Sequence, residues 1–139
     1  MKKIPDFFSD GTYKGQMKNG VPHGKGIYTS KFETKSRKKN KYFYKGDWVN
    51  GKKHGKAEHA YHLPTYVINF KGTYKDDLPH GHGVLIMKYK GKLEQKYVGE
   101  FKKGYRHGKG KLIDYFQKWT KKGTFLRGNF KKDIKWKKY

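Results

Sequence analysis

Large apolar residues and glycine alternate along this chain at a spacing of two, and the arrangement recurs. Each copy places a glycine midway between two large apolar residues, and there are five copies: Tyr13-Gly15-Met17, Tyr44-Gly46-Trp48, Phe70-Gly72-Tyr74, Tyr97-Gly99-Phe101 and Leu126-Gly128-Phe130. Their central glycines are separated by 31, 26, 27 and 29 residues, which is the range of stacked supersecondary units. Because one such unit cannot bury its own apolar face, the repeat predicts a stack of similar units.

The spacing within each copy predicts a β-strand. Side chains two residues apart share one face of a strand, so the glycine is a gap between two rings, and we expect a ring from a neighbouring unit to fill it. Asn19-Gly20 and Asn50-Gly51 follow the strands and are typical of tight hairpin turns. A His-Gly pair then opens a return strand in four copies: His23-Gly24, His54-Gly55, His80-Gly81 and His107-Gly108. Each unit is therefore predicted to be a β-hairpin.

The segments between the copies are connectors of different kinds. We expect a solvated lysine-rich loop from Lys31 to Lys41 and tight turns at residues 63–65, 90–92 and 119–123. Apart from residues 131–139, which we expect to close as a short helix or a tail, no segment has the 3.6-residue apolar period of a helix. The prediction is an all-β protein: a single-layer antiparallel meander of stacked hairpins with roughly ten strands.

The repeat resembles a known family. The segments "YKGDWVNGKKHGKA" from Tyr44 and "YVGEFKKGYRHGKG" from Tyr97 are similar to the MORN repeat, in which Tyr-x-Gly-x-Trp precedes a His-Gly-x-Gly segment. The similarity divides the chain into an N-terminal extension, residues 1–10, and a MORN-repeat domain, residues 11–139, with about five repeats. The last copy lacks the His-Gly pair and is degenerate, as a capping unit would be. In the second copy, Ala57 replaces the last glycine.

The resemblance implies a non-catalytic scaffold, since MORN proteins are found in cytoskeletal and ciliary assemblies and at membrane junctions. MORN repeats are also appended to lipid kinases, for which phosphoinositide binding has been proposed. We therefore expect no small-molecule substrate and no cofactor. The lack of cysteine excludes disulfides and thiolate zinc sites. No apolar run is long enough to cross a bilayer and no secretory signal is recognisable, so we expect an intracellular protein of the cytoplasm, cytoskeleton or cilium.

Charge then narrows the class of partner. The 139 residues contain 35 basic and 11 acidic side chains, which gives a formal net charge of +24. Only three of the basic residues are arginine, the side chain best suited to reading base edges, so the charge favours broad attraction to an acidic surface. Three partners stay open: an acidic protein surface such as that of tubulin, anionic lipid, and RNA. The alternative interpretation is that the lysines only make an aromatic-rich sheet soluble.

Two sets of residues are predicted to carry these roles. We expect lysines at the repeat turns, the connecting loop and the C-terminal tail to bind the anionic partner: Lys38, Lys39, Lys41, Lys52, Lys53, Lys102, Lys103, Lys131, Lys132, Lys135, Lys137 and Lys138. We expect the motif residues to stack the repeats: Tyr13, Gly15, Tyr44, Gly46, Trp48, Phe70, Gly72, Tyr74, Tyr97, Gly99, Phe101, Gly128 and Phe130.

The histidines do not predict chemistry. Four of them occupy equivalent repeat positions, where we expect the ring to support a turn by bonding backbone carbonyls; a catalytic histidine would occur once. The pairs His59-x-x-His62 and His80-x-His82 have no cysteine and no consistent carboxylate as a further ligand, so we expect neither a metal site nor a catalytic site.

Overall fold

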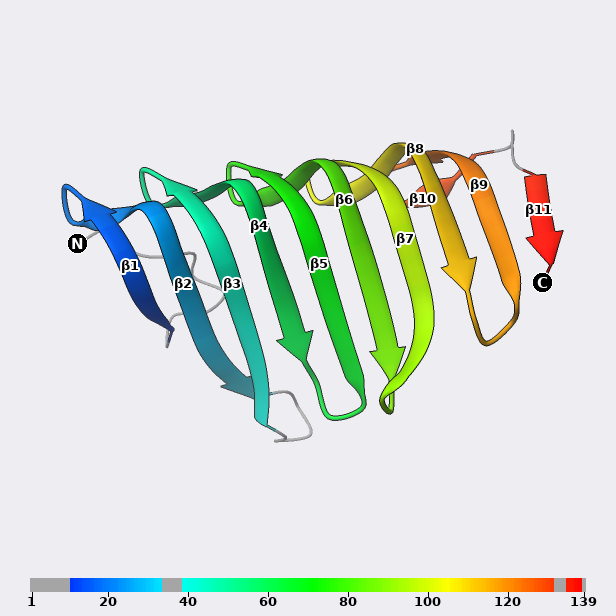
Figure 1. Ribbon diagram of the computed structural model, residues 1–139, viewed down its shortest axis with the longest axis horizontal. Coiled ribbons are helices and arrows are strands. Elements are labelled where there is room, and N and C mark those ends of the chain that lie inside the picture. The colour runs from blue at the N-terminus through cyan, green and yellow to red at the C-terminus, as the bar shows by residue number, and fades with distance from the viewer. Residues whose placement is uncertain (1–10, 34–38, 132–134, 139) are drawn as a thin grey trace.

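The described chain forms one open antiparallel sheet. The computed structural model describes residues 11–33, 39–131 and 135–138, and within these ranges it contains strands and turns but no helix. The strands follow one another across the sheet in chain order (Figure 1). They are β1 (Thr12–Lys18), β2 (Val21–Glu33), β3 (Lys39–Val49), β4 (Lys52–His62), β5 (Tyr66–Lys75), β6 (Leu78–Tyr89), β7 (Lys92–Lys102), β8 (Tyr105–Asp114), β9 (Trp119–Leu126), β10 (Asn129–Phe130) and β11 (Lys135–Lys138). The predicted single-layer meander is confirmed.

The C-terminal segment differs from the expected helix or tail. Strand β10 pairs with residues 125–126 of β9, and β11 pairs with residues 119–122 of the same strand. Both short strands therefore cover the edge of β9 that β8 leaves free. A sheet edge exposes unpaired backbone groups, and pairing with β11 satisfies them, which a short helix would not do.

Two connectors also differ from their predictions. Lys31–Glu33 pairs with Lys39–Lys41, so the strands extend into the segment that was expected to be a loop. Residues 119–123 belong to β9, and the turn lies at residues 115–118, where the Asp114 carboxylate accepts backbone N–H bonds from Phe116 and Gln117 at 3.0 and 2.7 Å. The turn expected at residues 63–65 lies between β4 and β5 as predicted, whereas the one expected at residues 90–92 occupies residues 90–91, because Lys92 begins β7.

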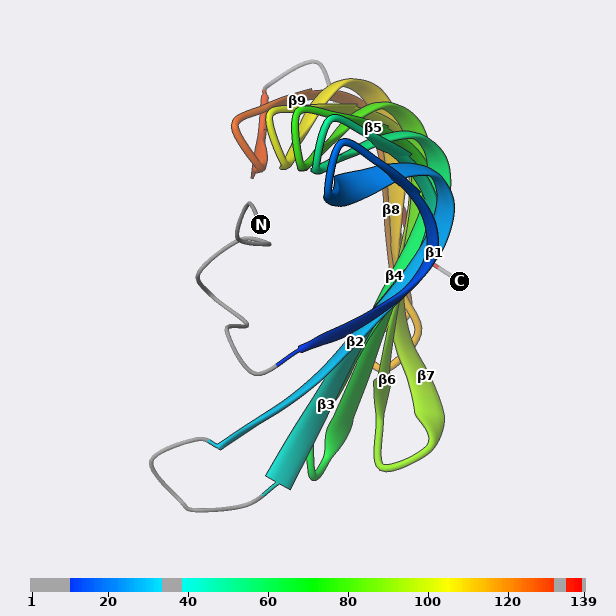
Figure 2. The same ribbon diagram turned by 90° about the vertical axis from the view of Figure 1, so that its left-hand side faces the viewer.

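Each motif glycine marks a bend in its strand. A β-bulge follows the glycine in four strands, since the pairing register shifts between Gly15 and Met17, Gly46 and Trp48, Gly72 and Tyr74, and Gly99 and Phe101. A bulge adds one residue to one strand and bends it. On the return strands the glycine of every His-Gly pair has a positive φ, between 72° and 96°. As a result, the hairpin tips fold back over one face of the sheet (Figure 2).

The hairpin tips are stacked on one another by a repeated backbone bond. In each of the four tips after the first, the N–H group of the second turn residue donates to the carbonyl of the residue before the histidine in the previous hairpin. The bonds run from Gly51 to Pro22, Asp77 to Lys53, Gly104 to Pro79 and Gly128 to Arg106, at 2.8 to 3.0 Å. The two turn residues of these tips have positive φ values, which explains the Asn-Gly dipeptides. The repeats are thus joined at their tips as well as by strand pairing.

The core is a continuous row of aromatic rings on the face that the tips cover. We call this the inner face and the opposite one the outer face. Neighbouring rings contact mostly edge to face, with centroids 4.7 to 5.4 Å apart, in the order Tyr13, Trp48, Tyr44, Tyr74, Phe70, Phe101, Tyr97, Phe125 and Phe130. Such pairs add to the stabilisation that burial alone provides. Curling over this row lets a single layer bury large side chains without a second sheet.

A row of residues without bulky side chains runs across the sheet beside these rings. Backbone pairing aligns them from β1 to β9: Gly15, Gly26, Gly46, Ala57, Gly72, Gly83, Gly99, Gly110 and Gly123. We call this the glycine row. The gap at each motif glycine is filled by the adjacent strand, through its backbone and, at Gly46, also through the Cβ of Ala57. At Gly15, Gly72 and Gly99 the ring of the preceding motif residue also occupies the gap. The expected ring from a neighbouring unit is therefore not the main occupant.

The glycine row also shows that the fifth copy of the motif begins at a different residue from the one predicted. Gly123 is its row member, and Phe125 provides its buried ring. Gly128, which was predicted as the strand glycine, lies in the tip with a φ of 84°. Phe130 still packs in the core, stacked on Phe125.

Candidate binding site

The outer face carries two lines of side chains beside the glycine row. Residues before and after each row member point away from the rings, because side chains alternate between the faces of a strand. Lys14, Lys45 and Lys71 lie on one side of the row, on β1, β3 and β5. Lys25 and Lys56 lie on the other side, on β2 and β4. Successive strands therefore place a lysine alternately on the two sides of the row.

Between these lines lies an open groove of about 760 Å³. Its floor is the backbone of the glycine row, and its walls are the five lysines together with Ile27, Glu58, Thr73 and His82. It extends from β1 to β6, and the lining contains five ammonium groups and one carboxylate, Glu58. We call this site the outer groove. Its charge can attract an anion along its length.

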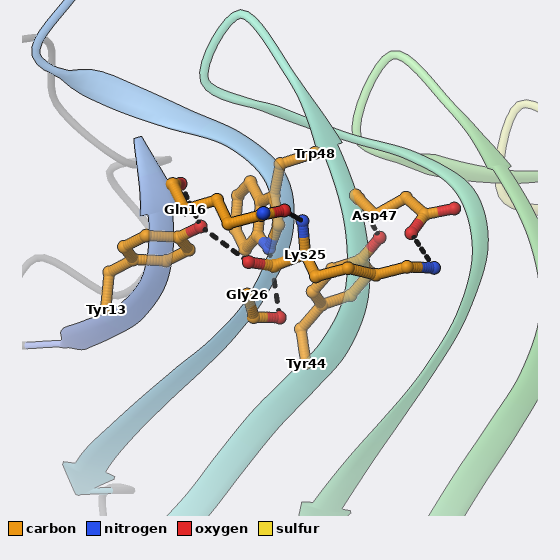
Figure 3. A network of polar contacts seen from close by, with 7 residues as sticks. All are labelled: Tyr13, Gln16, Lys25, Gly26, Tyr44, Asp47 and Trp48. Atoms are coloured by element: carbon orange, nitrogen blue, oxygen red, sulfur yellow. Dashed lines mark hydrogen bonds and ion pairs between the residues drawn. The ribbon is translucent and has the colours of Figure 1, made fainter. Parts of the chain in front are cut away.

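The β1 to β3 end of the groove is fixed by a polar network (Figure 3). The Lys25 ammonium lies 2.5 Å from the Asp47 carboxylate, and the Lys25 N–H donates to the Gln16 amide oxygen at 2.7 Å. Tyr13 donates to the carbonyl of Gln16 at 2.6 Å, and Trp48 donates from its indole to the carbonyl of Gly26 at 3.2 Å. Residues 16 and 47, which lie at the bulges, thus position the Lys25 side of the groove wall, and the rings of Tyr13 and Trp48 support the backbone of its floor from the inner face.

The bulge position performs the same task in the other repeats. Thr73 donates its hydroxyl to the carbonyl of His80 at 2.5 Å, and the Glu100 carboxylate accepts the N–H of Lys109 at 3.1 Å. In four repeats the residue after the motif glycine therefore ties its strand to the segment around a His-Gly pair on a neighbouring strand. This repeated bond sets the position of the groove walls relative to the floor.

The described members of the lysine set predicted to bind an anion are dispersed over the sheet. Lys52, Lys102 and Lys103 are exposed at the hairpin tips, whereas Lys41 is exposed near the opposite end of β3 and Lys131 follows β10. Lys39, Lys135, Lys137 and Lys138 have their backbone in strands β3 and β11. Lys38 and Lys132 lie outside the described residues. Among the residues that the structure describes, none of the predicted lysines lines the outer groove.

Lys53 is a correction to the predicted set, because its side chain is buried. Only 7% of it is exposed; its ammonium donates to the Tyr42 hydroxyl at 2.6 Å and lies over the rings of Tyr42 and Tyr44. Burial lowers the pKa of the Lys53 ammonium to about 8, and the nearby Asp77 carboxylate opposes this shift. Lys53 is thus a core residue of the inner face and is not accessible to a partner.

The repeated histidines act as acceptors at the tips. His23 Nδ1 accepts the N–H of Asn50 at 3.2 Å, and His80 Nδ1 accepts the N–H of Lys103 at 3.3 Å. The expected bonds to carbonyls are therefore wrong for these two rings, although their place at the turns is as predicted. The ring links one hairpin to the tip of the next.

The other candidate histidines are separated by the sheet. His59 lies on the inner face, stacked on Phe70 and hydrogen bonded to the Tyr74 hydroxyl, and its burial, together with the charge of Lys53, lowers the pKa of its imidazole to about 3. His62 is on the outer face against Phe43. These two rings cannot hold one ion. Within the described ranges no group of three or more His, Asp or Glu side chains has the geometry of a metal site.

The groove lysines have a sequence signal that is different from a run of lysines. Lys14, Lys45 and Lys71 stand between the ring and the glycine of the motif, and Lys25 and Lys56 follow the His-Gly pairs. Once the rings are assigned to the inner face, alternation places all five on the outer face.

Comparison with known families agrees with this geometry. The MORN repeat model matches residues 13–31, 44–60, 70–87 and 97–115, which together are more than half of the chain. The chain belongs to the MORN-repeat family, a class of generally non-enzymatic binding repeats. No curated protein matches the sequence. No helix in the described part of the chain meets the length and hydropathy needed to cross a bilayer.

Proposed function

We propose that this protein is a non-catalytic scaffold that docks on an acidic protein surface through the outer face of its MORN sheet. The observation that carries the proposal is the alternation of lysines on five successive strands along one groove. Of the five groove lysines, only Lys25 forms an ion pair with another described residue. Four exposed ammonium groups on a fixed backbone are therefore available to an external anion, and a charged surface of this kind speeds encounter with an acidic partner.

The partner we propose is an acidic subunit of a large intracellular assembly, cytoskeletal or axonemal, with the tubulin surface as the model case. The separation of the groove lysines from the core aromatic rings supports a protein partner over RNA. The core rings lie on the inner face, and the lining of the outer groove contains no Phe, Tyr or Trp on which bases could stack. The protein would act in the cytoplasm, on the cytoskeleton or in the cilium.

Anionic lipid is the second candidate, because lysine near a charged bilayer contributes about 1 kcal/mol per residue. Exposed apolar side chains at the hairpin tips favour it: Met17, Val49, Leu78, Tyr105 and Leu126. However, a phosphoinositide headgroup needs cations that converge on one point, whereas the groove lysines are spread over five strands.

The test is a direct comparison of three anionic surfaces at one ionic strength. Sedimentation with microtubules, with vesicles containing phosphatidylserine and phosphoinositide, and binding to single-stranded RNA are measured with the full chain. We expect the tightest binding to microtubules, with affinity falling as salt increases because screening shortens from about 8 Å at 0.15 M to about 3 Å at 1 M. Tighter binding to vesicles or RNA would contradict the proposal.

A further inference from the structure

The dimensions of the outer groove restrict what can lie in it. Six adjacent strands, β1 to β6, line it, and strands are spaced by about 4.8 Å, so its length is about 24 Å. An extended chain rises about 3.3 Å per residue, so about seven residues span this length. A helix rises only about 1.5 Å per residue and would need about 16 residues to span it. A short segment therefore follows the whole groove only when it is extended.

The distribution of charge agrees with an extended occupant. Side chains of an extended peptide alternate between two sides, and the groove lysines alternate between two walls: Lys14, Lys45 and Lys71 on one, Lys25 and Lys56 on the other. The strand spacing of about 4.8 Å exceeds the peptide rise of about 3.3 Å, and the flexible lysine stems can absorb this difference. Acidic side chains on both sides of one segment would therefore meet ammonium groups.

The floor explains why recognition depends on charge. The residues of the glycine row are paired from strand to strand, and they present no side chain to the groove. The Cβ atoms missing from the row would point to the inner face, toward rings such as those of Tyr13 and Phe70. The groove thus provides space and positive charge, but few groups that could read a sequence.

From these observations we propose that the outer groove binds an extended acidic segment of about seven residues, which crosses strands β1 to β6. This inference rests on the proposed function and names the element of the partner that enters the site: an unstructured acidic stretch, such as a glutamate-rich protein tail. Glu58 opposes binding, because it lies between Lys45 and Lys71 on the same line.

The experiment measures fluorescence anisotropy of labelled glutamate-rich peptides with the full chain. Peptides of increasing length are compared with a helix-locked peptide and a single-stranded oligonucleotide of equal charge. We expect the affinity to rise up to about seven residues and then to level off, and both competitors to bind at least about fivefold more weakly. A continued rise with length, or a competitor that binds as tightly as the heptapeptide, would overturn the inference.

Matched variants locate the site. The double substitution Lys45→Gln/Lys71→Gln should weaken heptapeptide binding about fivefold. The control, Lys111→Gln/Lys122→Gln, removes equal charge from the outer face of β8 and β9 and should weaken binding less than about twofold. Glu58→Gln should strengthen binding about twofold. Equal losses from the two double variants, or no gain from Glu58→Gln, contradict the groove as the site. If microtubules bind but the heptapeptide does not, the proposed function stands and this inference fails; if neither binds, both fail.

Discussion

A methyl group added to the glycine row at Gly46 should destabilise the sheet. A Cβ at this position would lie 2.2 Å from the Cβ of Ala57, 2.6 Å from its Cα and 2.7 Å from the carbonyl oxygen of Lys56. These distances are far below van der Waals contact, so the paired strands must separate or shift. Overpacking of this kind costs about 1 to 3 kcal/mol, and we expect Gly46→Ala to fall in that range.

Ala57 allows the reason to be tested. Ala57→Gly removes one of the three clashes, so the double variant should recover part of the loss, while the two backbone clashes persist. Ala57→Gly alone should cost about 0.5 to 1 kcal/mol from increased backbone entropy. Unfolding in urea gives the free energies for this double-mutant cycle, provided that the slope m is unchanged. Equal stabilities of Gly46→Ala and the parent, or strictly additive effects of the two substitutions, would refute the close-approach argument.

Three further predictions concern buried polar groups. Burial lowers the pKa of His59 to about 3 from 6.5, so the unfolded chain takes up a proton first as the pH falls. The free energy of unfolding should therefore decline between pH 6.5 and 3, by no more than about 5 kcal/mol. In acid titrations, His59→Phe should reduce this decline, whereas His62→Phe should not. Burial lowers the pKa of Lys53 to about 8 from 10.5, so between these values the unfolded chain binds more protons and the free energy of unfolding should rise from pH 8 to 10. In urea unfolding, Lys53→Met should abolish this rise and Lys52→Met should retain it. Asp114→Ala should lower stability by about 1 to 3 kcal/mol, measured by thermal unfolding, because the carboxylate bonds two turn N–H groups; a melting temperature equal to the parent's would contradict its role.

The fold was predictable because the signals that determine it are local. A ring, a glycine and a ring at a spacing of two indicate a strand face, and Asn-Gly indicates its turn. The fifth copy was misplaced because Leu126-Gly128-Phe130 reproduces the spacing of the motif although Gly128 is a turn residue, while the true row member, Gly123, has Lys121 where the first ring should be. Only the strand pairing in the structure distinguishes the row glycine, Gly123, from the turn glycine, Gly128.

The candidate site was less predictable, because charge runs do not report which face a side chain occupies. Lys52 and Lys53 are adjacent, yet one is exposed at a tip and the other is buried over the Tyr42 ring. The groove lysines are single residues about 11 to 20 positions apart in the sequence, and they become neighbours only through the pairing of five strands. Their alternation between two walls is a property of register, and register requires the structure.

The central claim is that the outer groove, and not the total positive charge, docks this protein on an acidic surface. The most direct measurement is the dissociation constant for microtubules of the parent, of Lys45→Gln/Lys71→Gln and of Lys111→Gln/Lys122→Gln, at one ionic strength and with equal folded fractions confirmed by circular dichroism. All double variants lose the same formal charge, so a general field predicts equal losses. The groove predicts a loss of about fivefold for the first pair and less than about twofold for the second. Equal losses for the two pairs, or no loss for either, would contradict the claim.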